Sequence, residues 1–175
     1  MSYILTYKKK EFYPLTPKVE DIDIEDIAHA LSLLCRANGH FKHFYSVAQH
    51  SLNCAREAIA RGYSKRVVLG CLLHDGSEAY LADITRPVKK HLHKYLEIED
   101  VLQGEIFEKW LPSLSEDEKK LIFEIDDAIL FYEFVELFGE KIFDYTPTLK
   151  SNPNFELVEF LTVEKDFLSL FYELT

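Results

Sequence analysis

Apolar residues recur along most of the chain at the three- and four-residue spacing that is typical of amphipathic helices. This pattern predicts about six helices, over residues 23–39, 46–61, 64–74, 87–110 and 115–138 and in the tail after Pro153. Gly104 marks a point where the fourth helix could break. Residues 1–20 carry alternating aromatics and prolines instead, which indicates an extended arm or a short strand pair packed on the domain. The fold class is therefore predicted to be all-α, a single helical bundle over residues 1–175 with an extended N-terminal arm.

The composition fits one globular domain and narrows its partners. Of the 175 residues, 47% are hydrophobic, which is enough for a sizeable core. The net charge of -10 argues against a nucleic-acid polymer, because a phosphate backbone is held by a broad basic surface. One small phosphorylated molecule needs only a local cationic cluster, and the segment 86–94 supplies one.

The cysteines and the N-terminus indicate a cytoplasmic protein. Cys35, Cys54 and Cys71 are odd in number and lie among apolar neighbours, so they are interpreted as reduced core cysteines. The first ten residues lack the apolar stretch of a signal peptide. No apolar run approaches the ~18 residues of a membrane span, so no membrane partner is expected.

The segment 74–83 is where chemistry is expected, because it places ionisable side chains directly after the apolar run 67–73. A buried histidine and aspartate need partners, and a metal ion satisfies both. His74 and Glu78 are four residues apart, and Asp75 and Glu78 are three apart. A helix that continued past Asp75 would put all three on one face. The basic residues that follow make a phosphate ester a suitable substrate.

Two further segments offer partners for this site. His50 is predicted to face inward on its helix, and the pair Asp126-Asp127 is bracketed by apolar residues, so at least one of the two should be buried. Spacing favours neither strongly. The residue seven positions after Asp127 is Phe134, whereas the one after Asp126 is Glu133, which tilts the prediction towards Asp127.

Two histidines and two carboxylates would then form a mixed nitrogen and oxygen shell: His50, His74, Asp75 and Asp127. Such a shell leaves positions for water and substrate and suits Zn, Mn, Co, Ni or Fe. Glu78 could orient or deprotonate an attacking water.

The order of these residues on an all-helical chain resembles the HD-domain metal-dependent phosphohydrolases. The closer likeness is to bacterial 5'-deoxynucleotidases and phage dATP triphosphohydrolases, over roughly residues 24–135. The matching motifs are Cys35-Arg36 with Gly39-His40, the run Phe44-Tyr45-Ser46-Val47-Ala48-Gln49-His50-Ser51, His74-Asp75 with Glu78-Ala79-Tyr80, and Asp83-Ile84 with Arg86-Pro87-Val88-Lys89.

The resemblance implies one divalent transition metal per chain, with the ligands His50, His74, Asp75 and Asp127. It implies that Glu78 assists the water and that Asp83 helps catalysis or contacts the sugar. Arg36 would bind phosphate, and Lys89 would be a further phosphate contact. The implied substrate is a small nucleotide, a deoxynucleoside 5'-monophosphate or triphosphate, and the implied assembly is a homo-oligomer.

Two departures from the family pattern matter. Ala37 stands where the 5'-deoxynucleotidases have a tryptophan that helps reject ribose, so deoxyribose selectivity is not implied. Gln49 replaces the usual glutamate before the first metal histidine, which is expected to change a hydrogen bond beside the ligand. The rival interpretations are a non-catalytic HD module that binds a nucleotide or a partner protein, and a metal-free helical interaction protein.

Overall fold

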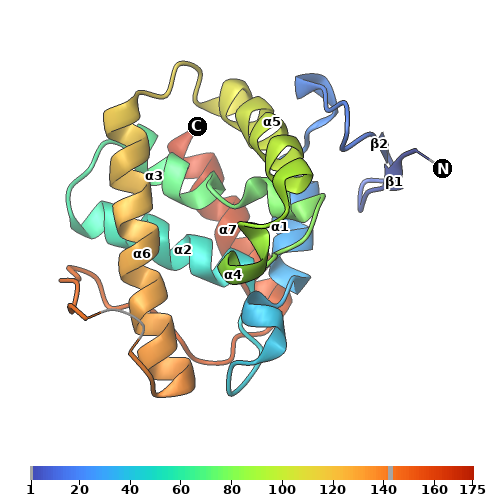
Figure 1. Ribbon diagram of the computed structural model, residues 1–175. Coiled ribbons are helices and arrows are strands. Elements are labelled where there is room, and N and C mark those ends of the chain that lie inside the picture. Colours follow the sequence, from blue (N-terminus) through green and yellow to red (C-terminus); the bar gives the residue numbers. More distant parts are fainter. Residues whose placement is uncertain (1, 142–143) are drawn as a thin grey trace.

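The computed structural model describes residues 2–141 and 144–175, and in this part of the chain the protein is essentially all-α, as predicted (Figure 1). Seven α-helices are present in the described residues: α1 (Ile24–Leu33), α2 (Val47–Ala60), α3 (Lys65–Leu73), α4 (Arg86–Lys89), α5 (His93–Trp110), α6 (Glu116–Phe138) and α7 (Phe160–Leu174). Three short 3-10 helices connect them: η1 (Val19–Asp21), η2 (Arg36–Gly39) and η3 (Gly76–Ala79).

The N-terminal arm is a small antiparallel hairpin of β1 (Ile4–Leu5) and β2 (Glu11–Phe12), which confirms the predicted strand pair. The hairpin projects from the helical body in Figure 1, but two contacts anchor it to that body. Phe12 is buried and stacks on Tyr80 with ring centroids 4.0 Å apart, and the backbone amide of Lys8 donates to Asp26 at 2.7 Å.

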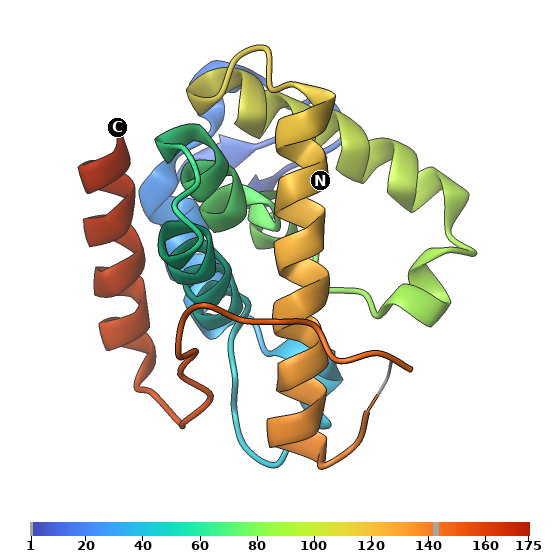
Figure 2. The ribbon, with the colours of Figure 1, turned by 90° about the vertical axis from the view of Figure 1, so that its left-hand side faces the viewer.

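Helices α2 and α3 form the centre of the bundle. Figure 2 shows them between α6 on one side and α7 on the other, and each packs against both. The side chains buried between these layers are aliphatic and aromatic, among them Leu52, Leu72, Ile125, Ile129 and Phe167. Each Å² of apolar surface removed from water stabilises the folded state by about 25 cal/mol, so this packing is the main source of stability.

Helices α3 and α6 pack tightly at Gly70. A Cβ atom added at Gly70 would lie 2.3 Å from Cδ1 of Ile122. Only glycine therefore allows the two helices this separation. Ile122 lies one helical turn before Asp126, so the same contact sets how near Asp126 comes to α2 and α3.

The ends of the longest helix are as predicted. The Ser115 side chain accepts from the Glu118 backbone amide, and the Glu118 side chain accepts from the Ser115 amide, which forms a capping box. Gly139 ends α6 in the left-handed conformation, at φ 77°.

Three predicted boundaries were wrong. The first helix ends at Leu33 rather than near Gly39, because Cys35 turns into an extended bridge with Ser46. The helix predicted from Pro87 is interrupted at residues 90–92 and not at Gly104, which lies inside α5.

The third wrong boundary bears on the predicted site. The α-helix over 64–74 ends at Leu73 with His74 as its C-cap, and Glu78 follows on η3. His74, Asp75 and Glu78 therefore do not share one face of a continuous helix.

Residues 147–156 are fastened across α2 by buried polar side chains. Glu57 accepts from the backbone amides of Lys150 and Ser151 at 3.0 and 2.8 Å. Gln49 donates through Nε2 to the backbone carbonyls of Asn154 and Glu156, at 3.1 and 3.0 Å. An ionised glutamate has no proton to donate to these carbonyls. This explains why glutamine stands at position 49, where the family that the sequence resembles usually has glutamate.

Among the described residues, no helix combines the length and the apolar character that crossing a bilayer requires.

Candidate functional site

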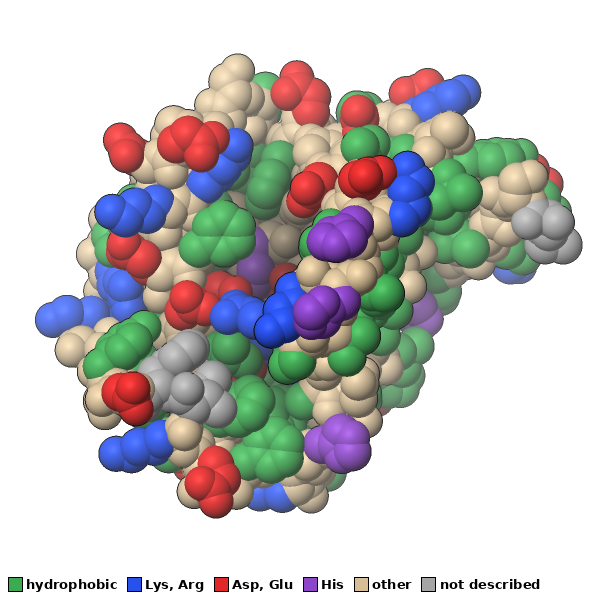
Figure 3. Space-filling model, in the orientation of Figure 1, with side chains coloured by type: hydrophobic (Ala, Val, Ile, Leu, Met, Phe, Trp, Pro, Cys, Tyr) green, Lys and Arg blue, Asp and Glu red, His purple; other side chains and the backbone are tan. Residues whose placement is uncertain are grey.

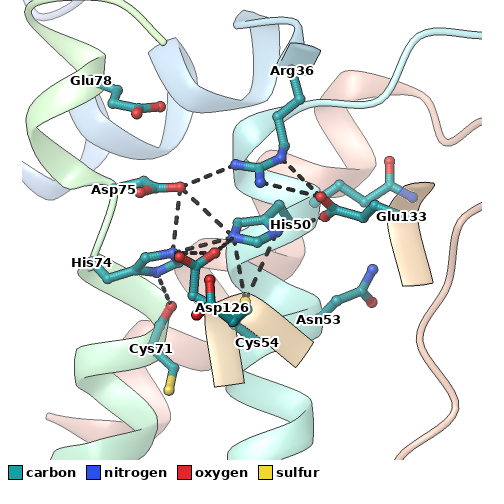
Figure 4. A network of polar contacts seen from close by, with 12 residues as sticks. Arg36, His50, Asn53, Cys54, Cys71, His74, Asp75, Glu78, Asp126 and Glu133 are labelled. Carbon is teal, nitrogen blue, oxygen red and sulfur yellow. Dashed lines mark hydrogen bonds and ion pairs between the residues drawn. The ribbon is translucent and has the colours of Figure 1, made fainter. Parts of the chain in front are cut away.

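Three side chains from three helices converge at the centre of the bundle (Figure 4). His50 lies on α2, His74 caps α3 and Asp126 lies on α6. The Nε2 atoms of the two histidines are 3.2 Å apart. Oδ1 of Asp126 lies 3.1 Å from Nε2 of His50 and 3.7 Å from Nε2 of His74.

The outer nitrogens of both histidines are already occupied. Nδ1 of His74 lies 2.8 Å from the Cys71 backbone carbonyl, which can only accept, so Nδ1 carries the proton. Nδ1 of His50 lies 2.6 Å from Oε1 of the fully buried Glu133. In the neutral imidazoles both Nε2 lone pairs therefore point at each other and at a carboxylate oxygen. Such a convergence of acceptors requires a cation, either a proton or a metal ion.

In the metal-free protein, the shifted pKa values favour protonated histidines and an ionised Asp126 in this cluster. Burial and the Arg36 cation act to lower the pKa of His50, but Cys54 and the carboxylates of Glu133 and Asp126 outweigh them and hold it well above its ordinary value. Burial acts to lower the pKa of His74, and Asp75 and Asp126 outweigh it and raise the pKa. Burial acts to raise the pKa of Asp126, but the two histidines hold it well below its usual range.

The cluster has the donor atoms of a site for one metal ion. One ligand atom from each of His50, Cys54, His74 and Asp126 can be chosen so that all lie within 4.8 Å of one another. Imidazole, thiol and carboxylate together are donors for a transition metal rather than for magnesium or calcium. The residues present therefore fit one metal ion.

The prediction that Asp127 is the buried carboxylate was wrong. Only 13% of the Asp126 side-chain surface is exposed, against 44% for Asp127. Asp127 lies beside the cluster and accepts from Nη1 of Arg86 at 2.7 Å. The inference failed because Glu133 was taken as a sign of an exposed face, whereas Glu133 is buried as the partner of His50.

Asp75 reaches the cluster from the side of Arg36. Its Oδ2 lies 3.4 Å from Nε2 of His74 and 3.8 Å from Nε2 of His50. Arg36 bridges this carboxylate to Glu133, with contacts of 3.3 and 3.2 Å. Burial acts to raise the pKa of Glu133, but Arg36 and His50 lower it to about 2, so Glu133 is an anion.

A cavity of about 830 Å³ opens next to the cluster. Figure 3 shows this face hollowed near its middle, with acidic and basic side chains gathered beside hydrophobic ones. Most of the predicted site residues line it: Arg36, His74, Asp75, Glu78, Asp83, Lys89 and Asp127. Its other walls are partly apolar, with Phe41, Ile84, Phe123, Leu130 and Phe134. The structure thus brings together residues that the sequence separates by up to 91 positions.

Glu78 and Asp83 are the carboxylates of the cavity wall. Glu78 is buried, and its Oε2 has no hydrogen-bond partner among the described residues. Burial, with Asp75 and Asp83 nearby, raises the pKa of Glu78 well above its usual range. Burial, together with Asp75, also raises the pKa of Asp83.

The basic side chains of the cavity are paired with carboxylates. Nζ of Lys89 lies 2.6 Å from Glu99 and 3.7 Å from Glu78. Nη2 of Arg86 donates to Oδ2 of Asp126 at 2.7 Å and so holds the outer oxygen of the carboxylate whose inner oxygen faces the histidines. In a phosphate complex, the phosphate oxygens would replace these carboxylates as hydrogen-bond acceptors of the basic side chains.

Glu133 and Cys54 were missed as functional candidates in the sequence, and Arg86 was predicted only as one of several cations in the segment 86–94. Glu133 lies seven residues after Asp126 on one helix face, and this spacing could have found it. Cys54 lies one turn after His50, where a core cysteine and a ligand look alike in a sequence. Arg86 stands in a basic stretch that does not reveal which member turns inward.

Comparison with known proteins adds relatives without an established activity. No family model matches the chain. It is 40% identical over 110 residues to the uncharacterized protein YfdR of Escherichia coli K12, covering 63% of this chain and 59% of YfdR. It is 43% identical over 98 residues to the uncharacterized protein RCAP_rcc00048 of Rhodobacter capsulatus, covering 53% of this chain and 50% of that protein. The chain thus spans about half to three fifths of the length of these curated relatives.

Proposed function

We propose that this protein is a metal-dependent phosphohydrolase of the HD-domain type that acts on small nucleotides. The observation that carries the proposal is the convergence of two imidazole Nε2 atoms and the Asp126 carboxylate beside a cavity that also holds Glu78 and three cations. A purely structural cluster has no need of basic side chains in an adjoining cavity, or of a buried carboxylate such as Glu78, whose Oε2 makes no hydrogen bond to the described residues.

In this proposal the metal is held by His50, His74 and Asp126, with Asp75 at the cavity side. A divalent ion bound there supplies Lewis acidity, which polarises a phosphoryl oxygen and makes a water molecule more acidic. Glu133 keeps the His50 lone pair directed at the centre, because it accepts the proton on Nδ1.

Glu78 is the general base of the proposed reaction. Burial and the neighbouring carboxylates raise its pKa, which makes Glu78 a stronger proton acceptor than an ordinary exposed carboxylate. Water adds to phosphorus, the bond to the leaving oxygen breaks, and the proton held by Glu78 passes to that oxygen. Arg36, Arg86 and Lys89 bind the phosphate and neutralise its charge.

The cavity volume and its apolar wall support a nucleotide rather than a bare phosphate ester. A cavity of about 830 Å³ exceeds what a phosphate group needs, and Phe41, Phe123 and Phe134 offer aromatic surfaces to a base. Whether one phosphate or triphosphate leaves depends on the substrate, since both reactions use the same centre.

The test is phosphate and triphosphate release from a panel of deoxy- and ribonucleoside mono- and triphosphates. The chelated protein would be assayed alone and after Mn, Co, Zn or Mg is restored. The proposal predicts release that depends on metal, and Glu78→Gln should retain the metal and lose most of the turnover. Absence of release by protein that holds one ion per chain would favour the non-catalytic nucleotide-binding module.

A further inference from the structure

Helix α3 ends immediately before the residues that carry the proposed chemistry. In an uninterrupted α-helix the backbone amide of residue 77 would donate to the carbonyl of residue 73. Here α3 ends at Leu73, and Ser77 belongs to the 3-10 helix η3 that follows. Leu73 and Ser77 are both buried, so the Leu73 carbonyl and the Ser77 amide require hydrogen-bond partners.

The side chain of Gln103 on α5 is the partner of both groups. Its Nε2 donates to the Leu73 carbonyl at 2.9 Å, and its Oε1 accepts from the Ser77 amide at 3.0 Å. The side-chain amide is thus inserted between the two backbone groups that one helical hydrogen bond would join. Insertion of a side chain into the hydrogen-bond ladder is a known cause of helix kinks, and it gives the end of α3 a physical reason.

The position of Gln103 requires an amide and a close approach. An ionised glutamate cannot donate to the Leu73 carbonyl, and a leucine of similar size offers neither a donor nor an acceptor. A Cβ atom added at Gly76 would lie 3.2 Å from Cδ1 of Ile106 and 3.8 Å from Oε1 of Gln103. Helix α5 therefore packs directly against the turn that follows α3.

This turn determines where Glu78 lies. The Glu78 amide donates to the Asp75 carbonyl at 3.0 Å. Oε2 of Glu78 makes no hydrogen bond to the described residues, and Nζ of Lys89 is 3.7 Å from its Oε1. The position of the carboxylate therefore follows mainly from the backbone of the turn. In a continuous helix, Glu78 would instead lie one turn after His74 on the same face.

We infer that Gln103 is a positioning residue, whose side-chain amide keeps residues 74–77 from continuing α3 and so places Glu78 for the attack of water. Its effect on turnover rests on the proposed function, whereas its effect on the backbone does not. The two effects are therefore measured separately.

NMR detects the hydrogen bonds directly. Scalar coupling across the hydrogen bond should link the Ser77 nitrogen to the side-chain carbonyl carbon of Gln103 in the wild type. In Gln103→Leu the Ser77 nitrogen should couple to the Leu73 carbonyl carbon instead, because the helix continues. A wild type without the coupling to Gln103, or a folded variant in which Ser77 does not couple to Leu73, would overturn the role of Gln103 in the turn.

Kinetics separate positioning from substrate contact, since Gln103 also lines the cavity. With saturating metal and a nucleotide that the wild type hydrolyses, Gln103→Leu and Gln103→Glu should lose about 100-fold in kcat with little change in KM, because a misplacement of about 1 Å can cost that much. Glu108→Leu, at an exposed position of the same helix, should keep the wild-type kcat. A raised KM with unchanged kcat in the Gln103 variants would show substrate contact and overturn the positioning role.

Failure of this role and failure of the proposed function give different results. If Gln103→Leu keeps the wild-type kcat although its helix continues, the positioning role is overturned and the proposed function stands. If the metal-loaded wild type hydrolyses no nucleotide, the proposed function is overturned, and the couplings of Ser77 still decide whether Gln103 interrupts the helix.

Discussion

Asp126 and Asp127 are adjacent in sequence, yet they have different surroundings. Successive residues of a helix point about 100° apart, so only one of the two can face the histidines. Asp126 does so and is largely buried, whereas Asp127 pairs with Arg86 at the rim of the cavity. The two positions therefore form a matched pair for mutation.

Asp126→Asn should lose bound metal and most of the activity, because an amide is a weak ligand for a transition metal. Asp127→Asn should keep one ion per chain and a similar affinity. Metal content by elemental analysis after dialysis distinguishes them, with circular dichroism to show that both variants fold. Retention of metal by Asp126→Asn together with its loss in Asp127→Asn would contradict the assignment.

Glu133 is fully buried and contacts both His50 and Arg36, through which it acts on the metal cluster. Glu133→Gln keeps the shape but removes the charge, so metal affinity should fall about 10–100-fold. Stability should fall by about 3 kcal/mol, because the buried Arg36 loses one partner and keeps Asp75. Glu136→Gln, at an exposed position of the same helix, is the control for metal titration and urea unfolding.

Between helices, the contact of Gly70 on α3 with Ile122 on α6 lies one helical turn from Asp126. Gly70→Ala would push against the buried Ile122 side chain and should destabilise the fold by about 1–3 kcal/mol. It should also weaken metal binding, because Asp126 moves away with α6.

Adding Ile122→Val to this variant removes the Cδ1 atom in the way and should restore part of both losses. Thermal unfolding and metal titration of the single and double variants measure this coupling. Purely additive effects of the two substitutions would contradict the contact.

The helices themselves were largely predictable from local signals, whereas the segments that join them were not. The capping box at Ser115 and the glycine at Gly139 fix both ends of α6 through their own neighbours. The end of α1 depends instead on the bridge of Cys35 with Ser46, a tertiary contact that leaves no periodic pattern.

The candidate site was predictable in its membership more than in its geometry. His50, His74 and Asp75 meet as expected, and Asp83 lines the same cavity as His74 and Asp75. The choice between adjacent aspartates could not be made, because it depends on a buried glutamate whose charge made the face look exposed.

At the scale of the whole molecule, the centre joins α2, α3 and α6, so metal binding should stabilise the fold. An ion present at 100 times its dissociation constant adds about 2.7 kcal/mol to the free energy of unfolding. Thermal unfolding of chelated and reconstituted protein measures this gain.

The gain should increase with pH. Because the folded metal-free protein raises the pKa values of His50 and His74, their protonation contributes stability that is fully present below about pH 6.5 and is lost as the pH rises through the folded values. A metal ion replaces these protons, so its effect on the unfolding temperature should be larger at pH 8 than at pH 6. A gain that shrinks with pH would contradict the histidine ligands.

The chain has a net charge of -10, and the cavity places Arg36, Arg86 and Lys89 among several carboxylates. Three local cations suit one small anion better than a nucleic-acid polymer, which needs a broad basic surface. Assembly into a homo-oligomer stays a prediction from the resemblance.

A stoichiometric titration tests the proposed metal-dependent hydrolysis. Chelated protein would receive Co(II) in fractions of an equivalent while phosphate or triphosphate release from a nucleotide substrate is recorded. Activity should be absent at the start, rise in proportion to added metal and reach its plateau at one equivalent per chain. Full activity in the chelated protein, or none after one equivalent has bound, would contradict it.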